Sequence, residues 1–181
     1  MVERYTHLAI GEFPRRFNVA HGQLAPVTCD GVLAGRRWGL LSPWRGHGGV
    51  RPPSIYDVSV HALDAKPVLR RARHGLVHAD GFYTWRQLPG GKARPFWLHG
   101  DGPLMFACLC ATHHDDGIDS FALVIGPDGA PLVVTESWLA GVTFEPFAWR
   151  EAAISRWFQN ASHDDDKCIE PLGNPRQLSL I

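Results

Sequence analysis

This sequence contains short clusters of histidines and acidic residues, which are side chains that can bind metals or transfer protons. Two runs, His113-His114-Asp115-Asp116 and His163-Asp164-Asp165-Asp166, contain side chains of the kinds that bind metals. Adjacent residues of an extended chain point in opposite directions, so neither run has the spacing of a metal site, and both lie beside turn-forming Gly or Asn. We therefore predict solvated loops at both runs, with no metal and no cofactor.

The four cysteines offer thiol chemistry only if one of them is exposed and ionised. They are Cys29, Cys108, Cys110 and Cys168, and they form no Cys-x-x-Cys motif. Cys108 and Cys110 are spaced as two residues on the same face of a strand. The pattern therefore predicts reduced, buried thiols and no zinc site.

Three histidines, His61, His74 and His78, lie close in sequence to a predicted basic helix. Any of them could serve as a general acid or base. General acid or base catalysis needs a reacting group to assist, and no activated nucleophile accompanies these histidines in the sequence. They identify no reaction by themselves.

The elements that must position these residues are mostly strands. Two β-prone runs, residues 24–29 and 32–38, are separated by Asp30-Gly31, a pair suited to a type I′ hairpin turn. Further strand-like runs are residues 75–79, 82–86, 96–99, 104–110 and 121–125, with turn signals at Pro89-Gly90-Gly91 and Gly100-Asp101-Gly102. Many short strands with such turns predict a mostly β fold with short helices (α+β) and a barrel-like β core.

Two helices are expected beside these strands. A short one runs from about Pro67 to Arg73 and carries a basic face of Arg70, Arg71 and Arg73. A longer one runs from Pro146 to about Asn160, because its apolar residues repeat at helical spacing. The remainder, residues 163–181, is acidic and predicts an extended turn and tail. Without repeats or a linker, the sequence predicts a single domain over residues 1–181.

Composition and charge limit the classes of protein to which this chain can belong. The chain is 45% hydrophobic and 20% charged, which is typical of a globular protein and excludes a disordered one. No apolar run approaches the roughly 20 residues of a membrane-spanning helix, so we expect a cytoplasmic protein without a membrane partner. Residues 1–100 hold 14 Lys or Arg against 6 Asp or Glu, and residues 101–181 hold 4 against 12. Either the first part binds an anionic partner, or the two parts neutralise each other.

Four segments, in this order, resemble the SRAP (SOS response-associated peptidase) family. They are residues 16–23, 38–44, 66–70 and 79–85, which read RFNVAHGQ, WGLLSPW, KPVLR and ADGFYTW. The resemblance covers roughly residues 1–144 and extends to the ending QLSLI. It implies an SRAP-like domain that binds single-stranded DNA at an abasic site, with a cysteine nucleophile directly after the initiator methionine.

The positions that carry the chemistry of the resembled family are altered in this sequence. In that family the amine and thiol of one cysteine close on the sugar aldehyde as a thiazolidine, and neither group alone makes that ring. Here the residue after Met1 is Val2, Tyr56 stands at the family's Asn, Thr84 at its Glu and Thr135 at its His. Thr84 and Thr135 offer hydroxyls but no identifiable adjacent base. We therefore assign no catalytic residue.

Positions that could hold DNA are retained. The resemblance implies DNA contacts for Arg4, Arg16, Asn18 and Trp44, with Arg45 beside them. Arginine pairs with phosphate and tryptophan stacks on bases, and neither contact needs a catalytic group. The alternative is that Arg4 and Arg16 are solvated or ion-paired. Trp38 and Trp85 are expected to be core aromatics, because large aromatic side chains are usually buried.

Three hypotheses follow for the function. The leading one is a non-enzymatic module that binds single-stranded or damaged DNA in a DNA damage response. The second is a weakened abasic-site enzyme that uses the α-amine of Val2 to form a Schiff base. The third is a protein-interaction domain, with an unknown protein partner, that no longer binds DNA.

Overall fold

The computed structural model describes residues 12–41, 53–63, 67–114, 116–140 and 146–173. These residues form two compact units. Unit 1 takes its residues from the ranges 1–14, 20–79 and 104–147, and unit 2 from 15–19, 80–103 and 148–181. Among the described helices, none has the length and apolar character needed to cross a membrane.

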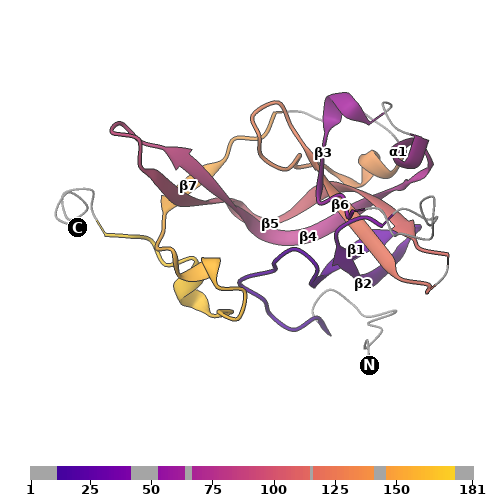
Figure 1. The fold of residues 1–181 in the computed structure, drawn as a ribbon, viewed down its shortest axis with the longest axis horizontal. Coiled ribbons are helices and arrows are strands. Elements are labelled where there is room, and N and C mark those ends of the chain that lie inside the picture. The colour runs from indigo at the N-terminus through magenta and orange to yellow at the C-terminus, as the bar shows by residue number, and fades with distance from the viewer. Residues whose placement is uncertain (1–11, 42–52, 64–66, 115, 141–145, 174–181) are drawn as a thin grey trace. The chain divides into compact units, whose positions relative to one another are not determined.

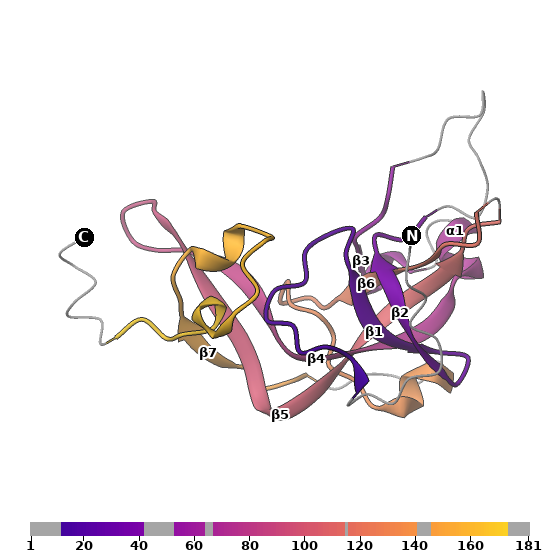
Figure 2. The same cartoon turned by 90° about the horizontal axis from the view of Figure 1, so that it is seen from below.

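Unit 1 contains a closed barrel of five strands (Figures 1 and 2). The strands are β1 (Leu24–Cys29), β2 (Val32–Trp38), β6 (Asp119–Ile125) and the unit 1 portions of β4 (Arg73–Gln87) and β5 (Ala93–Thr112). Their order is β6-β2-β1-β4-β5, and a further pairing of β5 with β6 closes the ring. The short strand β3 (Asp57–Ser59) pairs in parallel with β6. The prediction of a mostly β fold with a barrel-like core is confirmed.

The hairpin of β1 and β2 follows from its turn residues. Asp30 and Gly31 have φ angles of 53° and 73°, the left-handed values that a type I′ turn requires at both central positions. The strands then pair antiparallel, with Cys29 opposite Val32 and Leu24 opposite Arg37. Both predicted strands and the predicted turn are confirmed.

The core of unit 1 lies on both faces of the barrel wall. Successive side chains of a strand point to opposite faces, so the buried neighbours Leu109 and Cys110 lie on opposite sides of β5. The Leu109 side packs against the helical segments α1 (Pro67–Arg71), η3 (Val60–Ala62) and η4 (Glu136–Ala140). The buried cluster on that side is Leu40, Val58, Leu69, Leu76, Ala107, Leu109, Ala122, Val124, Leu132 and Trp138. The predicted helix from Pro67 is confirmed, although it ends at Arg71.

Unit 2 is built on the other portions of β4 and β5. In the turn between them the Leu88 amide donates to the Lys92 carbonyl oxygen and the Gly91 amide donates to the Leu88 carbonyl oxygen, so the turn predicted at Pro89-Gly90-Gly91 is confirmed. The turn predicted at residues 100–102 is wrong, because β5 continues through them as one strand. β7 (Arg150–Ala153) pairs antiparallel with β5, and this pairing holds residues 96–99 in strand conformation.

The long helix predicted from Pro146 to Asn160 is also wrong. Residues 150–153 form β7 instead, and a single 3-10 turn, η5 (Trp157–Gln159), follows it. Ile154 is buried, whereas Trp157 on the supposed apolar face is exposed. Hydrogen bonding to β5 therefore overrides the helical propensity of the Arg-Glu-Ala-Ala run. A second 3-10 turn, η6 (Asp166–Cys168), interrupts the predicted extended tail.

Candidate nucleic-acid interface

Tyr56 lies in an aromatic cluster on unit 1. Its ring stacks on His21, with ring centroids 4.0 Å apart and planes inclined by 12°. The ring also lies against the backbone of Gly39, since a Cβ there would be 2.9 Å from Tyr56 Cε1. Gly39 has φ = 127°, a value that other residues rarely adopt. The position assigned to the family's Asn is thus filled by a closely packed aromatic ring.

Trp38 and Arg37, the last residues of β2, complete this surface. The Trp38 ring meets His21 edge-on at 4.5 Å, and its Nε1 donates to the Tyr56 carbonyl oxygen at 2.9 Å. Arg37 places Nη1 3.4 Å from the Gly39 carbonyl oxygen and 3.4 Å from Ser54 Oγ. We call His21, Arg37, Trp38 and Tyr56 the Tyr56 cluster. Trp38 is half-buried, which agrees with its expected packing role.

The Tyr56 cluster suits non-covalent binding. His21 is exposed and Tyr56 is half-buried, so their stacked rings offer a planar surface. Arg37 adds a guanidinium that has no acidic partner within the part of the chain that the structure describes. Aromatic rings bind bases by stacking and arginine binds phosphate, so this set can hold a nucleotide strand without bond formation.

Thr135 lies elsewhere on unit 1, directly before η4. It is exposed, and its Oγ1 is 2.7 Å from Ser137 Oγ. This contact pairs two hydroxyl groups and supplies no base.

The three histidines near the predicted basic helix have different surroundings. His74 stacks on Trp138 at 4.5 Å, and its Nδ1 is 3.1 Å from the Trp138 carbonyl oxygen. His78 Nε2 is 2.8 Å from Thr28 Oγ1. Burial lowers the pKa of His78 below its ordinary value of 6.5, and the Glu136 carboxylate offsets part of this effect. His61 is exposed. His74 and His78 thus serve packing and hydrogen bonding in unit 1.

Asn18 belongs to unit 2 and is buried. Its Nδ2 donates to the carbonyl oxygens of Phe158 at 2.7 Å, Asn160 at 3.2 Å and His163 at 3.0 Å. A side-chain amide has two donor hydrogens, so these three acceptors use its full donor capacity. In this arrangement Asn18 joins the 15–19 segment to the C-terminal part of unit 2.

Arg16 is ion-paired with Asp164, as the alternative for this residue expected. Asp164 also accepts from the backbone amides of Phe17 at 2.6 Å and Asn18 at 2.9 Å. Burial alone would raise the pKa of Asp164, but these amides and Arg16 together hold it below its ordinary value. The prediction of a solvated loop at residues 163–166 is therefore wrong for Asp164, because its carboxylate binds the backbone amides and the arginine of the 16–18 segment.

Thr84 and Trp85 lie side by side on β4 in unit 2. Thr84 is half-buried. Trp85 is 41% exposed, so the expectation of a core aromatic is wrong at this position. Arg156 lies over its ring at 5.2 Å, and Phe158 is tilted against it at 6.1 Å. Packing on one side leaves much of the indole at the surface.

Four of the predicted positions, Val2, Arg4, Trp44 and Arg45, lie outside the described residues. Their DNA contacts, and the missing thiol at Val2, stay predictions from the sequence. Arg16 and Asn18 are the DNA-binding candidates that the structure places, and both lie in unit 2.

The four cysteines are free and buried, as predicted. Cys108 and Cys110 place their sulfurs 3.7 Å apart on the inner side of β5. The thiol hydrogen bond with Cys110 and burial both raise the pKa of Cys29. The raised pKa keeps the Cys29 thiol protonated, so it is a poor nucleophile. Arg36 is buried near them, with Nη1 3.1 Å from Asp119 Oδ2 but without hydrogen-bond geometry, and the sequence analysis did not identify it.

The run at residues 113–116 also differs from the prediction of a solvated loop. His113 is fully buried and its Nδ1 is 2.8 Å from Asp116 Oδ1. The carboxylate shapes the turn into β6 by also accepting from the Ile118 amide at 3.2 Å. Within the residues that the structure describes, no group of three or more His, Cys, Asp or Glu side chains is arranged to hold a metal ion.

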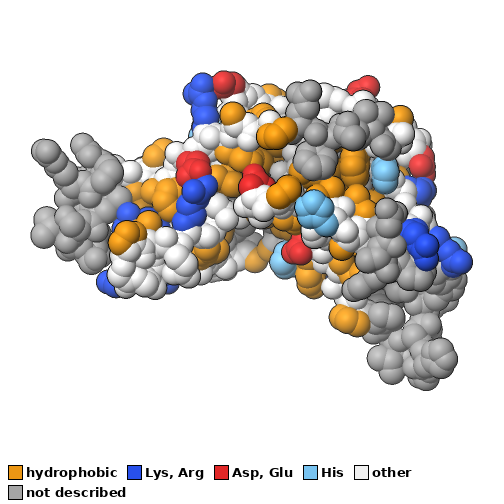
Figure 3. Space-filling view, turned by 90° about the horizontal axis from the view of Figure 1, so that it is seen from above, with side chains coloured by type: hydrophobic (Ala, Val, Ile, Leu, Met, Phe, Trp, Pro, Cys, Tyr) orange, Lys and Arg blue, Asp and Glu red, His pale blue; other side chains and the backbone are white. Residues whose placement is uncertain are grey.

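Some of the positive charge of the N-terminal part is paired with acids within the units. On the face drawn in Figure 3, Lys and Arg side chains lie beside Asp and Glu side chains at several places. The pairs of this part are Arg16 with Asp164, Arg36 with Asp119, Arg73 with Asp30 and Arg86 with Glu151. Internal neutralisation thus accounts for these arginines, whereas Arg37 and Arg70 lack acidic partners within the described segments.

Comparisons with known proteins add a family and a fold. The family model described as SOS response associated peptidase (SRAP) matches residues 2–178. A crystal structure of a protein from Bacteroides thetaiotaomicron is 14% identical, with a TM-score of 0.66 over 83% of this chain and 82% of that one. A crystal structure of a phage-related protein from Bordetella bronchiseptica is 20% identical, with a TM-score of 0.59 over 83% of this chain and 93% of that one. A search of curated proteins found no match.

Proposed function

We propose that this chain, which belongs to the SOS response associated peptidase (SRAP) family, binds single-stranded or damaged DNA without forming a covalent bond to it. Binding would be by stacking and phosphate contacts, as part of a DNA damage response. The proposal has two parts, the loss of covalent chemistry and the retention of a nucleic-acid surface. Each part has its own support and its own experiment.

The observation that carries the proposal is the Tyr56 cluster. The resemblance assigns a polar Asn to position 56, whereas here Tyr56 stacks on His21 at 4.0 Å beside the Arg37 guanidinium. An aromatic ring at this position cannot donate or accept the hydrogen bonds of a side-chain amide, and it supports the exposed His21 ring, on which a base would stack. Base stacking on an aromatic side chain contributes about 1–3 kcal/mol per base.

The loss of covalent chemistry is supported by several positions together. Val2 has no thiol, so the thiazolidine ring cannot form. Thr84 and Thr135 replace an acid and a base with hydroxyls, which do not transfer protons near neutral pH. Groups that act as a unit in one site fail together, so we expect Val2→Cys alone not to restore covalent activity.

An adduct assay tests this first part. Full-length protein is incubated with abasic-site single-stranded DNA and run on a denaturing gel, with and without borohydride. We expect no heat-resistant band under either condition. A band without reductant would contradict the loss of covalent chemistry. A band only after reduction would support the alternative of a Schiff base at Val2.

A binding assay tests the second part. Fluorescence anisotropy measures affinity for single-stranded DNA, with and without an abasic site, at several salt concentrations. Tyr56→Ala should weaken binding about 5- to 150-fold with little change in salt slope, because stacking is uncharged. Arg37→Gln should lower the slope by roughly one unit, because it removes one phosphate contact.

The controls separate a specific surface from general charge. Lys92 is exposed on the turn of unit 2, and Lys92→Gln removes one positive charge away from the cluster. It should leave affinity and slope unchanged within error. Arg4→Ala and Trp44→Ala test the retained family positions in the same way. If folded wild-type protein binds no single-stranded DNA at low salt, the proposal fails and a protein-interaction domain takes its place.

A further inference from the structure

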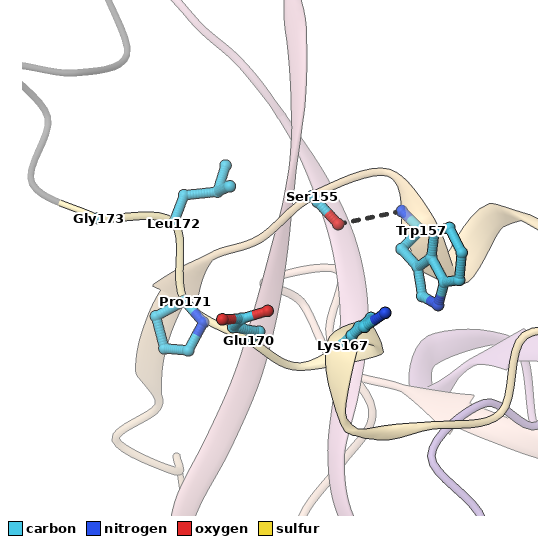
Figure 4. Close-up of a pocket in the computed structure, with 7 residues that line it drawn as sticks. All are labelled: Ser155, Trp157, Lys167, Glu170, Pro171, Leu172 and Gly173. Atoms are coloured by element: carbon cyan, nitrogen blue, oxygen red, sulfur yellow. Dashed lines mark hydrogen bonds between the residues drawn. The ribbon is translucent and has the colours of Figure 1, made fainter.

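A pocket on unit 2 lies apart in sequence from every position discussed for DNA. It has a volume of about 340 Å³ and is formed by the segment around η5 and by the segment from η6 to Gly173 (Figure 4). Small-molecule sites in proteins usually measure about 300–1,000 Å³, so this pocket suits a compact ligand. Trp157, Lys167, Glu170, Pro171 and Leu172 supply the side chains that matter for its chemistry.

The apolar wall of the pocket is an exposed tryptophan that is held in place. Trp157 is 38% exposed, although its ring stacks on His163 at 3.7 Å and its Nε1 donates to Asp165 Oδ1 at 3.0 Å. Its backbone amide donates to Ser155 Oγ at 3.2 Å, the bond drawn in Figure 4. A ring fixed by stacking and by its Nε1 hydrogen bond loses little conformational entropy when a ligand packs on it. Pro171 and Leu172 line the pocket as further apolar side chains.

The pocket also presents one group of each charge. Lys167 Nζ lies 5.5 Å from the Trp157 ring centroid, and Glu170 lines the same pocket. Both side chains are exposed, and neither forms an ion pair within the described part of the chain. In unit 2 this differs from Arg16, Arg86 and Arg150, each of which is paired with a carboxylate. The pocket therefore offers a carboxylate without an ionic partner and an ammonium whose recorded contact is the cation–π contact with Trp157.

We propose that this pocket binds the zwitterion of an α-amino acid with an apolar side chain. The ligand carboxylate pairs with Lys167, the ligand ammonium pairs with Glu170, and the side chain packs on the exposed part of Trp157 beside Pro171 and Leu172. A ligand with a single charge would leave one of the two protein groups without a partner. The site does not depend on DNA binding, because none of its residues belongs to the Tyr56 cluster or to the retained family positions.

Solvent exposure sets the expected strength. Exposed ion pairs contribute only about 0–1 kcal/mol each, so we expect a dissociation constant on the order of 1 mM. The probe is 4-fluoro-L-phenylalanine, and its fluorine NMR signal is followed while full-length protein is added. We expect a saturable shift that Trp157→Ala weakens about tenfold. Lys167→Gln and Glu170→Gln should each weaken it by up to about fivefold.

Modified ligands test the charge assignment. The N-acetyl derivative has no ammonium, so its affinity should be lower and should not change with Glu170→Gln. The amide derivative has no carboxylate, so its affinity should not change with Lys167→Gln. These cycles isolate each pair because each step removes one partner. Equal binding of the N-acetyl derivative would overturn the proposal and indicate a peptide carboxyl terminus as the ligand.

Matched variants keep the experiment decisive. Lys92→Gln removes an exposed lysine outside the pocket and should leave the shift unchanged. Lys167 and Glu170 are exposed, so their variants should fold even if Trp157→Ala does not. Absence of a saturable shift with folded wild-type protein, or a shift unaffected by both charge variants, would overturn the proposal. Either result leaves the DNA-binding proposal untouched, and loss of DNA binding by Tyr56→Ala would likewise leave this one untouched.

Discussion

Different interactions stabilise the interior of each of the two units. Unit 1 buries apolar side chains on both faces of a closed barrel, and Phe121 and Leu109 are nearly inaccessible to solvent. Unit 2 buries few side chains, among them Leu98, Ile154 and the polar Asn18. Its segments are joined by the hydrogen bonds of Asn18 and Asp164 and by stacked aromatics such as Tyr83 on Phe158 at 4.3 Å.

Because of this difference, we expect the two units to be destabilised by different kinds of substitution. Burial of apolar area is non-directional and spread over many contacts, so unit 1 loses stability mainly through cavities in its core. Hydrogen bonds to a single amide or carboxylate are directional, so unit 2 depends on a few atoms. A substitution in unit 2 should therefore act locally, and one in the barrel should act on the whole unit.

The largest expected effect is a cavity in the barrel. Phe121→Ala removes a buried ring that stacks with Trp38 at 6.2 Å, and such truncations cost about 3–5 kcal/mol in free energy of unfolding. Leu139→Ala is the matched control, because Leu139 is an exposed apolar residue of unit 1. Denaturant unfolding measures both variants. A loss below about 1 kcal/mol for Phe121→Ala would contradict the packing described for unit 1.

The next effect is the removal of one amide from unit 2. Asn18→Ala deletes donors to three carbonyl oxygens, and at about 1 kcal/mol for each bond the cost is about 2–3 kcal/mol. Gln87→Ala is the control, because it removes an exposed side-chain amide from the unit 2 portion of β4. Hydrogen exchange followed by mass spectrometry should show lost protection in residues 150–168 and retained protection in β1 and β2. Equal loss in both units would contradict the local role of Asn18.

The same contrast explains what could be predicted from sequence. The hairpin of unit 1 was predictable because turn residues and alternating burial are local signals, as at Asp30-Gly31. In unit 2 the helix prediction failed, because β7 exists only through its pairing with β5, far away in sequence. Exposure of Trp85 was missed for the same reason. Local patterns do not encode which faces receive a partner.

The candidate site was only partly predictable. The resemblance marked Tyr56 as an altered position, but its stacking on His21 joins residues 35 positions apart and has no local signal. Asn18 and Arg16 were predicted to contact DNA, whereas the structure shows what they do within unit 2. Asp164 was assigned to a solvated loop because its partners, the amides of Phe17 and Asn18, carry no sequence signature.

The smallest expected effects concern acid, and they separate the units by pH. In unit 1, burial holds the pKa of His78 below 6.5, its ordinary value. The unfolded chain then binds a proton at a higher pH than the folded one, so stability falls as pH drops below about 6.5. In unit 2, hydrogen bonds and Arg16 hold the pKa of Asp164 below 3.8, the ordinary value, so its contribution is lost only as pH falls below that value.

Two variants test the contributions of His78 and Asp164 in these two pH ranges separately. His78→Gln keeps a hydrogen-bonding group near Thr28 and removes the titrating imidazole. The decrease in free energy of unfolding just below pH 6.5 should therefore become smaller, and the decrease below pH 3.8 should remain. Asp164→Asn should lower the free energy of unfolding at neutral pH, because a neutral side-chain amide is a weaker acceptor for the backbone amides of Phe17 and Asn18. It should also remove part of the decrease in stability below pH 3.8. Thermal melts across pH measure both, with His61→Gln as the exposed-histidine control. If His78→Gln melts with the wild-type pH profile, the His78 imidazole does not change its proton binding on unfolding, and the assignment of the pH range just below 6.5 to His78 is wrong.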